Sequence, residues 1–170
     1  MMRFTCLLAV VVAAGWLCGC QSVKVPQPSA SSPEAEAAMK KTCQFLKEAK
    51  FYCLATVDGD QARVRPFGTV HIFEGKLYIQ TGRRKNVAKQ LLANGKVELC
   101  AVRDREWIRV TGTLVEDPRR EARVSMLEAY PGLKKMYSPD DGNTMVLYFQ
   151  PGTVTAVFSA YSPKSVTVKF

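Results

Sequence analysis

This chain of 170 residues has little of what a metal site needs. His71 is its only histidine, and its six cysteines include no C-x-x-C pair. Structural and catalytic zinc sites require clusters of such residues, so no metal site is expected. No internal repeat is present, and no nucleophile stands out beside a general base. We therefore assign no catalytic residue from the sequence.

The N-terminus lacks a long apolar span but carries a shorter one. Arg3 precedes an uncharged, largely apolar run of 14 residues, 4–17, which is too short to cross a bilayer comfortably. The following Leu17-Cys18-Gly19-Cys20 resembles the lipobox of bacterial lipoproteins. That resemblance implies removal of residues 1–19 and lipidation of Cys20; the alternative is an ordinary cleaved signal peptide in which Cys20 is incidental.

We therefore divide the chain into a signal peptide (1–19), a flexible tether with lipidated Cys20 (20–32) and one folded domain (33–170). The tether carries Pro26, Pro28 and four serines. In the lipoprotein pattern, an aspartate after the lipidated cysteine marks retention in the inner membrane. This chain has Gln21-Ser22 there, which argues against such retention. The expected location is the cell envelope, on the periplasmic side of the outer membrane or the outer face of the cytoplasmic membrane.

The domain reads as mainly β with short helices. Ser32-Pro33-Glu34 predicts a helix start, followed by an apolar stripe of Met39, Cys43 and Leu46. Gly95 is expected to end a second helix, over 86–94, in the left-handed conformation. Strands are expected at 51–57, 62–73 (broken at Pro66-Phe67-Gly68), 76–81, 96–102, 106–115, 145–150 and 153–159, with a third helix after Asp117-Pro118 and a loop over 131–143. About six antiparallel strands flanked by helices predict a small barrel.

Positive charge gathers where a phosphate could bind. After loss of the signal peptide 23 Lys and Arg face 15 Asp and Glu, a net charge of +8 that favours an anionic partner. Arg63 and Arg65 share one face of a strand, because strand side chains alternate. Thr81 ends the next strand, and the run Arg83 to Lys85 leads into a helix start, which attracts phosphate. The alternative for this run is a solvated loop.

Several segments together resemble the pyridoxamine 5′-phosphate oxidase-like family over about 40–160. They are Phe51-Tyr52-Cys53-Leu54-Ala55-Thr56-Val57, Arg63-Val64-Arg65-Pro66-Phe67-Gly68, Gly75-Lys76-Leu77-Tyr78-Ile79-Gln80-Thr81, Lys85-Asn86-Val87, Gln90-Leu91-Leu92-Ala93-Asn94, Val97-Glu98-Leu99 and Trp107-Ile108-Arg109-Val110-Thr111-Gly112. The resemblance implies a split β-barrel that binds FMN at the interface of a homodimer.

The resemblance also assigns roles by position. Arg65 and Lys85 match the basic residues that bind the cofactor phosphate, and Thr81 matches the polar residue ending the third strand. Pro66, Phe67 and Gly68 match the segment that runs along the flavin ring. Arg84 takes the place of a serine or arginine of the phosphate loop. One position departs from the family, because Trp107 stands where the oxidases place a glutamine near the cofactor.

Other departures argue against true pyridoxamine-phosphate oxidation. The chain ends Val166-Thr167-Val168-Lys169-Phe170 and lacks the family's C-terminal segment with arginine and histidine, and His71 is read as a solvent-facing strand residue. Aromatic residues beside basic ones also occur in single-strand binders, but the secretion signal argues against nucleic acid. We therefore expect an FMN-dependent oxidoreductase acting on a small molecule. The rival is a non-enzymatic lipoprotein that binds haem or another anionic planar ligand.

Three cysteines remain after Cys20. Cys43, Cys53 and Cys100 lie in segments of apolar character, and Cys53 and Cys100 fall on two predicted strands. Small apolar cysteines are often core residues. We expect Cys53 and Cys100 to lie near one another in the core as free thiols, with a disulfide as the alternative.

Overall fold

The computed structural model describes residues 32–160 and 165–170, which fold mainly as strands. The helical elements of this part are α1 (Pro33–Ala49), α2 (Asn86–Ala93), α3 (Arg120–Ala129) and a short 3-10 helix, η1 (Pro131–Lys135). The strands are β1 (Tyr52–Asp58), β2 (Gln61–Phe67), β3 (His71–Phe73), β4 (Lys76–Gly82), β5 (Lys96–Arg103), β6 (Glu106–Asp117), β7 (Thr144–Phe149), β8 (Thr155–Ala160) and β9 (Val166–Lys169). The predicted mainly-β class with short helices is confirmed. The signal peptide, Cys20 and the tether up to residue 31 lie outside the described residues.

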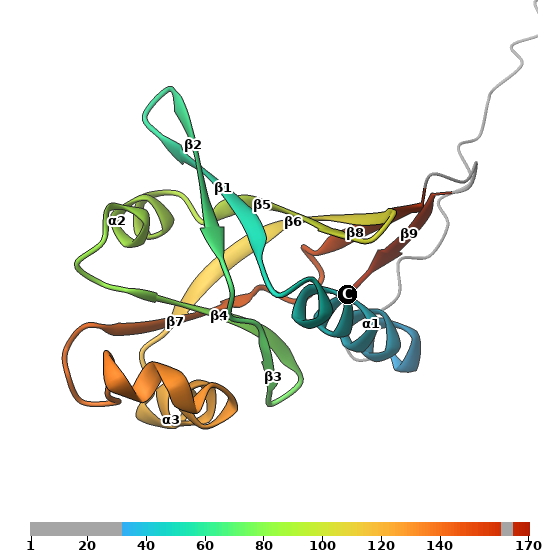
Figure 1. The fold of residues 1–170 in the computed structure, drawn as a ribbon. Helices are drawn as coiled ribbons and strands as arrows, with labels where there is room; N and C mark the ends of the chain where they lie inside the picture. Colours follow the sequence, from blue (N-terminus) through green and yellow to red (C-terminus); the bar gives the residue numbers. More distant parts are fainter. Residues whose placement is uncertain (1–31, 161–164) are drawn as a thin grey trace, which may run out of the picture.

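The strands form one antiparallel sheet in the order β2-β1-β5-β6-β7-β4-β3, with β8 added to β6 and β9 added to β8. The path of paired strands ends at β2 and β3 and does not close within the described residues, as in a split barrel. Figure 1 shows the β1–β2 hairpin at one end, α1 beside β9 and α3 beside β7. The described residues form nine strands where the sequence predicts seven strand segments, because 62–73 forms two strands and β9 was missed.

Helix α1 begins where the sequence predicts. The Ser32 hydroxyl accepts a hydrogen bond from the Ala35 amide at 3.1 Å, and Pro33 occupies the first turn. Met39, Cys43 and Leu46 are all buried on one face of the helix. This face packs on the main core, which also includes Leu54, Leu99 and Ile108 of the sheet.

Gly95 differs from its prediction. It does not adopt a left-handed conformation; α2 ends at Ala93, and its C-cap residue Asn94 has φ −148°. A Cβ atom on Gly95 would lie 2.3 Å from the Leu114 carbonyl oxygen, and the Gly95 carbonyl accepts from the Leu114 amide at 2.8 Å. Glycine is needed here for the close approach of β6, a long-range requirement that a helix-ending pattern does not reveal.

The segment 62–73 is predicted to form one strand with a break, but it forms two separate strands, β2 and β3. β2 pairs with β1, whereas β3 pairs with β4 at the far end of the sheet. The break lies at 68–70, and Pro66 sits within β2 opposite Cys53. β2 ends the path of paired strands, so the missing proline N–H interrupts no further pairing.

A polar network ties β4 to the end of β6. The buried Tyr78 hydroxyl donates to Asp117 Oδ2 at 2.9 Å, and Arg119 donates to the same carboxylate from Nη2 at 2.8 Å and Nε at 3.0 Å. Arg119 also pairs with Glu74 at 2.8 Å. The network therefore fixes the end of β6 where α3 follows.

None of the helices in the described part of the chain is long and apolar enough to cross a membrane.

Candidate functional site

Arg65 holds its guanidinium against neutral oxygen atoms. Nη1 donates to Thr56 Oγ1 at 2.6 Å and to the Leu54 carbonyl at 3.3 Å, and Nη2 donates to Gln90 Oε1 at 2.8 Å. Thr56 and Leu54 lie in register with Arg63 and Arg65 across β1 and β2, so both arginines share one face, as the alternation of strand residues predicts. Three elements, β1, β2 and α2, thus meet at one guanidinium.

The charge of Arg65 has no carboxylate partner within ion-pairing distance among residues 32–160 and 165–170. Burial of the group, followed by the nearby charge of Arg63, lowers its pKa, while the Asp58 carboxylate acts in the opposite direction. The guanidinium stays protonated in proteins. Arg63 differs, because its Nε pairs with Asp58 at 3.2 Å. Arg65 is therefore an oriented cation whose charge remains available to an external anion.

The start of α2 provides a second group of donors. Lys85 occupies the N-cap position, and no side chain caps the first amides of the helix. Such amides and the positive end of the helix dipole favour a phosphate. The preceding loop is fixed by Asn143, whose carbonyl accepts from the Arg83 amide at 2.7 Å and whose Oδ1 accepts from the Arg84 amide at 3.1 Å.

The three basic residues of this loop are not equivalent. Arg83 pairs with Glu116, so its charge is compensated. Arg84 and Lys85 are exposed and make no ion pair within the described chain; the Lys85 ammonium lies 6.0 Å from the centre of the Tyr137 ring. The structure leaves two of the three cations open, Arg84 and Lys85, both named from the sequence.

The other predicted positions make none of the hydrogen bonds to Arg65. Thr81 is buried near the end of β4, in register with Met145. Pro66 and Gly68 are exposed at the end of β2, while Phe67 is half-buried 6.0 Å from the Tyr52 ring. Trp107 lies on β6, beyond β1 and β5 in the sheet, and packs against Arg109 at 5.6 Å. One chain therefore does not bring Trp107 to Arg65.

An open hollow of about 420 Å³ lies beside the Arg65 cluster. Asn86, Lys89 and Gln90 of α2 form one wall, and the β1–β2 turn at Asp58 and Gly59 forms another. Its lining mixes the amide and ammonium groups of α2 with the Asp58 carboxylate and the apolar side chains of Val57 and Ala93.

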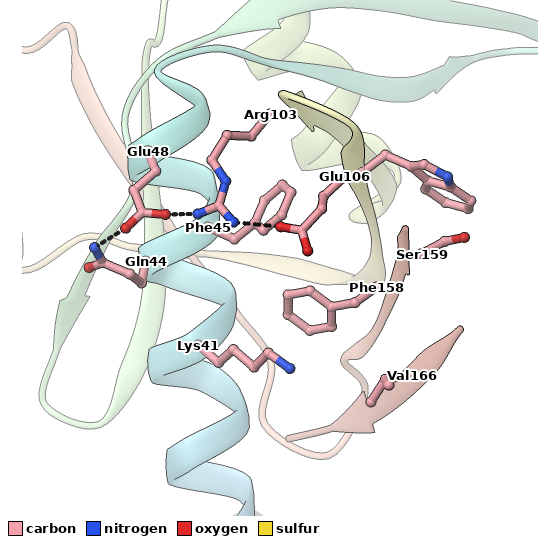
Figure 2. Close-up of a pocket in the computed structure, with 10 residues that line it drawn as sticks. Lys41, Gln44, Phe45, Glu48, Arg103, Glu106, Phe158, Ser159 and Val166 are labelled. Atoms are coloured by element: carbon pink, nitrogen blue, oxygen red, sulfur yellow. Dashed lines mark hydrogen bonds and ion pairs between the residues drawn. The ribbon is translucent and has the colours of Figure 1, made fainter. Parts of the chain in front are cut away.

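A second hollow, also about 420 Å³, lies between α1, the β5–β6 turn and β8 (Figure 2). Phe45 and Phe158 meet edge to face at 5.8 Å in its floor. Arg103 lies 4.7 Å from the Phe45 ring centre and pairs with Glu48 and Glu106, while Lys41 lies 4.4 Å from the Phe158 ring centre. Because the carboxylates of Glu48 and Glu106 line this hollow and pair with Arg103, it suits an anion less well than the Arg65 cluster does.

The comparisons with known proteins agree with this fold. The pyridoxamine 5′-phosphate oxidase domain family matches residues 38–158. The chain belongs to this family. A NimC/NimA family protein from Clostridium acetobutylicum is 42% identical, with a TM-score of 0.78 over 81% of this chain and 95% of that one.

Two solved structures with lower sequence identity share this fold and are described by the ligand that they bind. An FMN-binding, pyridoxamine 5′-phosphate oxidase-related protein from Nostoc punctiforme is 18% identical, with a TM-score of 0.56 over 83% of this chain and 98% of that one. A haem-binding protein from Mycobacterium smegmatis is 14% identical, with a TM-score of 0.62 over 85% of this chain and 60% of that one. These two show the fold alone. No curated protein sequence matches the chain.

Thr56 and Gln90 were not identified as site residues from the sequence, although both bind Arg65. Gln90 Oε1 accepts from Thr56 Oγ1 at 2.7 Å as well as from Arg65, which closes a ring of three side chains. One signal was present, because Gln90 follows Val87 by three residues and lies on the buried face of α2. A glutamine on an apolar helix face needs a hydrogen-bond partner, but the sequence does not say which.

His71 and the cysteines also differ from expectation. His71 is half-buried, not solvent-facing, and its Nε2 lies 2.8 Å from the Ser125 hydroxyl; burial and then Lys47 lower its pKa. Cys53 and Cys100 are neighbours, as predicted, and are free thiols, but they are exposed and not in the core. Within the described residues no group of three or more metal-ligating side chains forms.

Proposed function

We propose that this member of the pyridoxamine 5′-phosphate oxidase family binds FMN and serves as an oxidoreductase for a small molecule at the cell envelope. The observation that carries the proposal is Arg65, an oriented guanidinium that forms no ion pair within the described residues. The uncapped start of α2 and the open cations Arg84 and Lys85 add donors suited to a phosphate dianion. FMN, when bound, supplies the electron and hydride transfer.

In this proposal the chain holds and orients the cofactor. Arg65 and Lys85, helped by Arg84, bind its phosphate, and Thr81 supports the end of β4 beside that loop. The exposed backbone around Pro66, Phe67 and Gly68 faces the flavin ring. Trp107 contributes from a second copy, because in its own chain it lies two strands beyond β1.

A homodimer is the second part of the proposal. The outer face of β2, β1, β5 and β6 exposes apolar side chains, with Val64 65% and Val102 61% exposed. Register pairs place Cys53, Ala55, Pro66, Cys100 and Trp107 on this face as well, together with the ion pair of Glu98 and Arg109. An exposed apolar face of this kind marks an interaction site, and a second copy of the same face is the expected occupant in a two-fold dimer.

The absorbance spectrum of the mature protein after incubation with FMN and gel filtration tests the cofactor. Retained flavin absorbance, with weaker retention of riboflavin, supports the proposal, because riboflavin lacks the phosphate. A colourless protein that instead takes up haem would replace it with the rival function. The phosphate group favours FMN over haem, because haem lacks a phosphate and because Arg65 and the uncapped start of α2 would bind one.

A further inference from the structure

In the ring of Arg65, Thr56 and Gln90, the glutamine oxygen accepts hydrogen bonds from both of the other side chains. We infer that Gln90 is a positioning residue of the anion site, which orients Arg65 and, being uncharged, leaves the arginine's charge for a phosphate. This inference rests on the proposed function. It assigns the preference for a phosphorylated over an unphosphorylated flavin to a residue that itself need not touch the ligand.

The orientation follows from the hydrogen bonds. Gln90 Oε1 accepts from Arg65 Nη2 at 2.8 Å and from Thr56 Oγ1 at 2.7 Å, and Thr56 Oγ1 accepts from Arg65 Nη1 at 2.6 Å. Both terminal nitrogens of the guanidinium are therefore fixed. Thr56 and Gln90 are buried, so water competes little for these bonds. The arginine is held in one pose before any ligand arrives.

The ring also links Arg65 to the helix start. Gln90 belongs to α2, whose N-cap is Lys85. Gln90 and Asn86 of the first turn of α2 line the same hollow. The hydrogen bond from Arg65 to Gln90 therefore joins β2 to the helix beside this hollow, although 25 residues separate the two side chains.

The absence of charge on Gln90 matters as much as its position. A glutamate could place a carboxylate oxygen where Gln90 Oε1 lies and would form an ion pair with Arg65. The arginine would then be oriented but compensated, as Arg83 is by Glu116. Glutamine supplies the acceptor without the negative charge. Gln90 therefore separates orientation from neutralisation, which a single substitution can test.

The experiment measures FMN and riboflavin dissociation constants for the mature chain in mild detergent. We expect Gln90→Glu to weaken FMN binding by about tenfold to a hundredfold and to change riboflavin binding by less than about twofold. Its thermal midpoint should stay equal or rise, because a new ion pair forms. Leu92→Glu is the matched control: it adds the same charge to an exposed position of α2 and should leave both ligands nearly unchanged.

A second pair of variants tests whether Gln90 acts through Arg65. Gln90→Leu should weaken FMN binding about threefold to tenfold in the native background and should have no further effect in Arg65→Ala. Full additivity of the two changes would overturn the positioning role. If the native protein shows no preference for FMN over riboflavin, the proposed function fails together with this inference. If that preference exists and survives Gln90→Glu, the inference alone fails.

Discussion

Cys53 and Cys100 face each other directly across the neighbouring antiparallel strands β1 and β5. Both thiols are free and exposed, whereas Cys43 is buried in α1. Directly opposed residues of antiparallel strands have α-carbons roughly 4.5–5.5 Å apart, and disulfides form at roughly 4.4–6.8 Å. The two thiols are therefore spaced for an intrachain disulfide, although they are free in the structure.

We expect three free thiols when the untreated 21–170 fragment is denatured, and one after treatment of the folded fragment with oxidised glutathione. The two thiols pass two electrons and two protons to the added disulfide. Desolvation, then Cys53 and Glu98, raises the pKa of Cys100, so thiolate is scarce and closure should be slow. Cys53→Ser should abolish the closure. A protected pair in the untreated fragment would contradict the free-thiol prediction.

Arg65→Ala should weaken FMN binding by about one to two decades, because a charge-assisted hydrogen bond contributes about 1.5–3 kcal/mol and tenfold in affinity is about 1.4 kcal/mol. Riboflavin should be nearly indifferent. Arg63→Ala is the matched control, since Arg63 shares the face but already pairs with Asp58. Titration of both flavins, with circular dichroism to check the fold, makes the comparison. Equal losses for FMN and riboflavin in a folded variant would show that Arg65 does not read the phosphate.

The 21–170 fragment should sediment as a homodimer, and Val64→Glu should shift it to monomer by placing a charge in the apolar face. Leu92→Glu, an exposed apolar position on α2 outside that face, should remain dimeric. Sedimentation velocity distinguishes the two states. A native fragment that stays monomeric and still binds FMN tightly would exclude the dimer proposal.

Asp117→Asn should destabilise the protein at neutral pH. Burial alone would raise the pKa of Asp117, but hydrogen bonds from Arg119 and Tyr78 outweigh it and lower the pKa from 3.8 to about 2. The ionised form is thus favoured by folding, so the stabilisation is present above pH 3.8 and is lost as the pH falls toward 2. A shift of this size corresponds to about 2 kcal/mol. Urea unfolding at pH 7 and pH 3 should show the gap between native protein and variant shrinking in acid, whereas Asp140→Asn, in an exposed pair, should show little effect.

Cys20→Ala should abolish membrane attachment, because lipid chains anchor a protein through their buried methylenes. Labelled fatty acid should enter the native protein but not the variant, and membrane fractionation should follow the label. This prediction rests on Leu17-Cys18-Gly19-Cys20 alone, which lies outside the described residues. Unchanged labelling of the variant would end the lipoprotein interpretation.

Features fixed by local chemistry could be predicted from the sequence. Ser32-Pro33 caps α1 as expected, and the predicted stripe of Met39, Cys43 and Leu46 is buried. Features that depend on distant partners could not. Gly95 responds to the backbone of β6, and Gln90 responds to arginine and threonine side chains 25 and 34 residues away. The separate pairing of β2 and β3 is likewise a property of the whole sheet.

Strand β6 has a consequence for how the molecule comes apart. Its earlier residues pair with both β5 and β8, and Leu114 to Asp117 pair with β7. The half of the sheet that carries Arg65 and the half that carries Tyr78 therefore share one strand, and neither can detach without breaking its ladder. Unfolding should be all-or-none rather than stepwise. Thr111 pairs with Thr155, 44 positions later in the chain. Such a contact between distant residues forms more slowly than a local hairpin, so it slows folding.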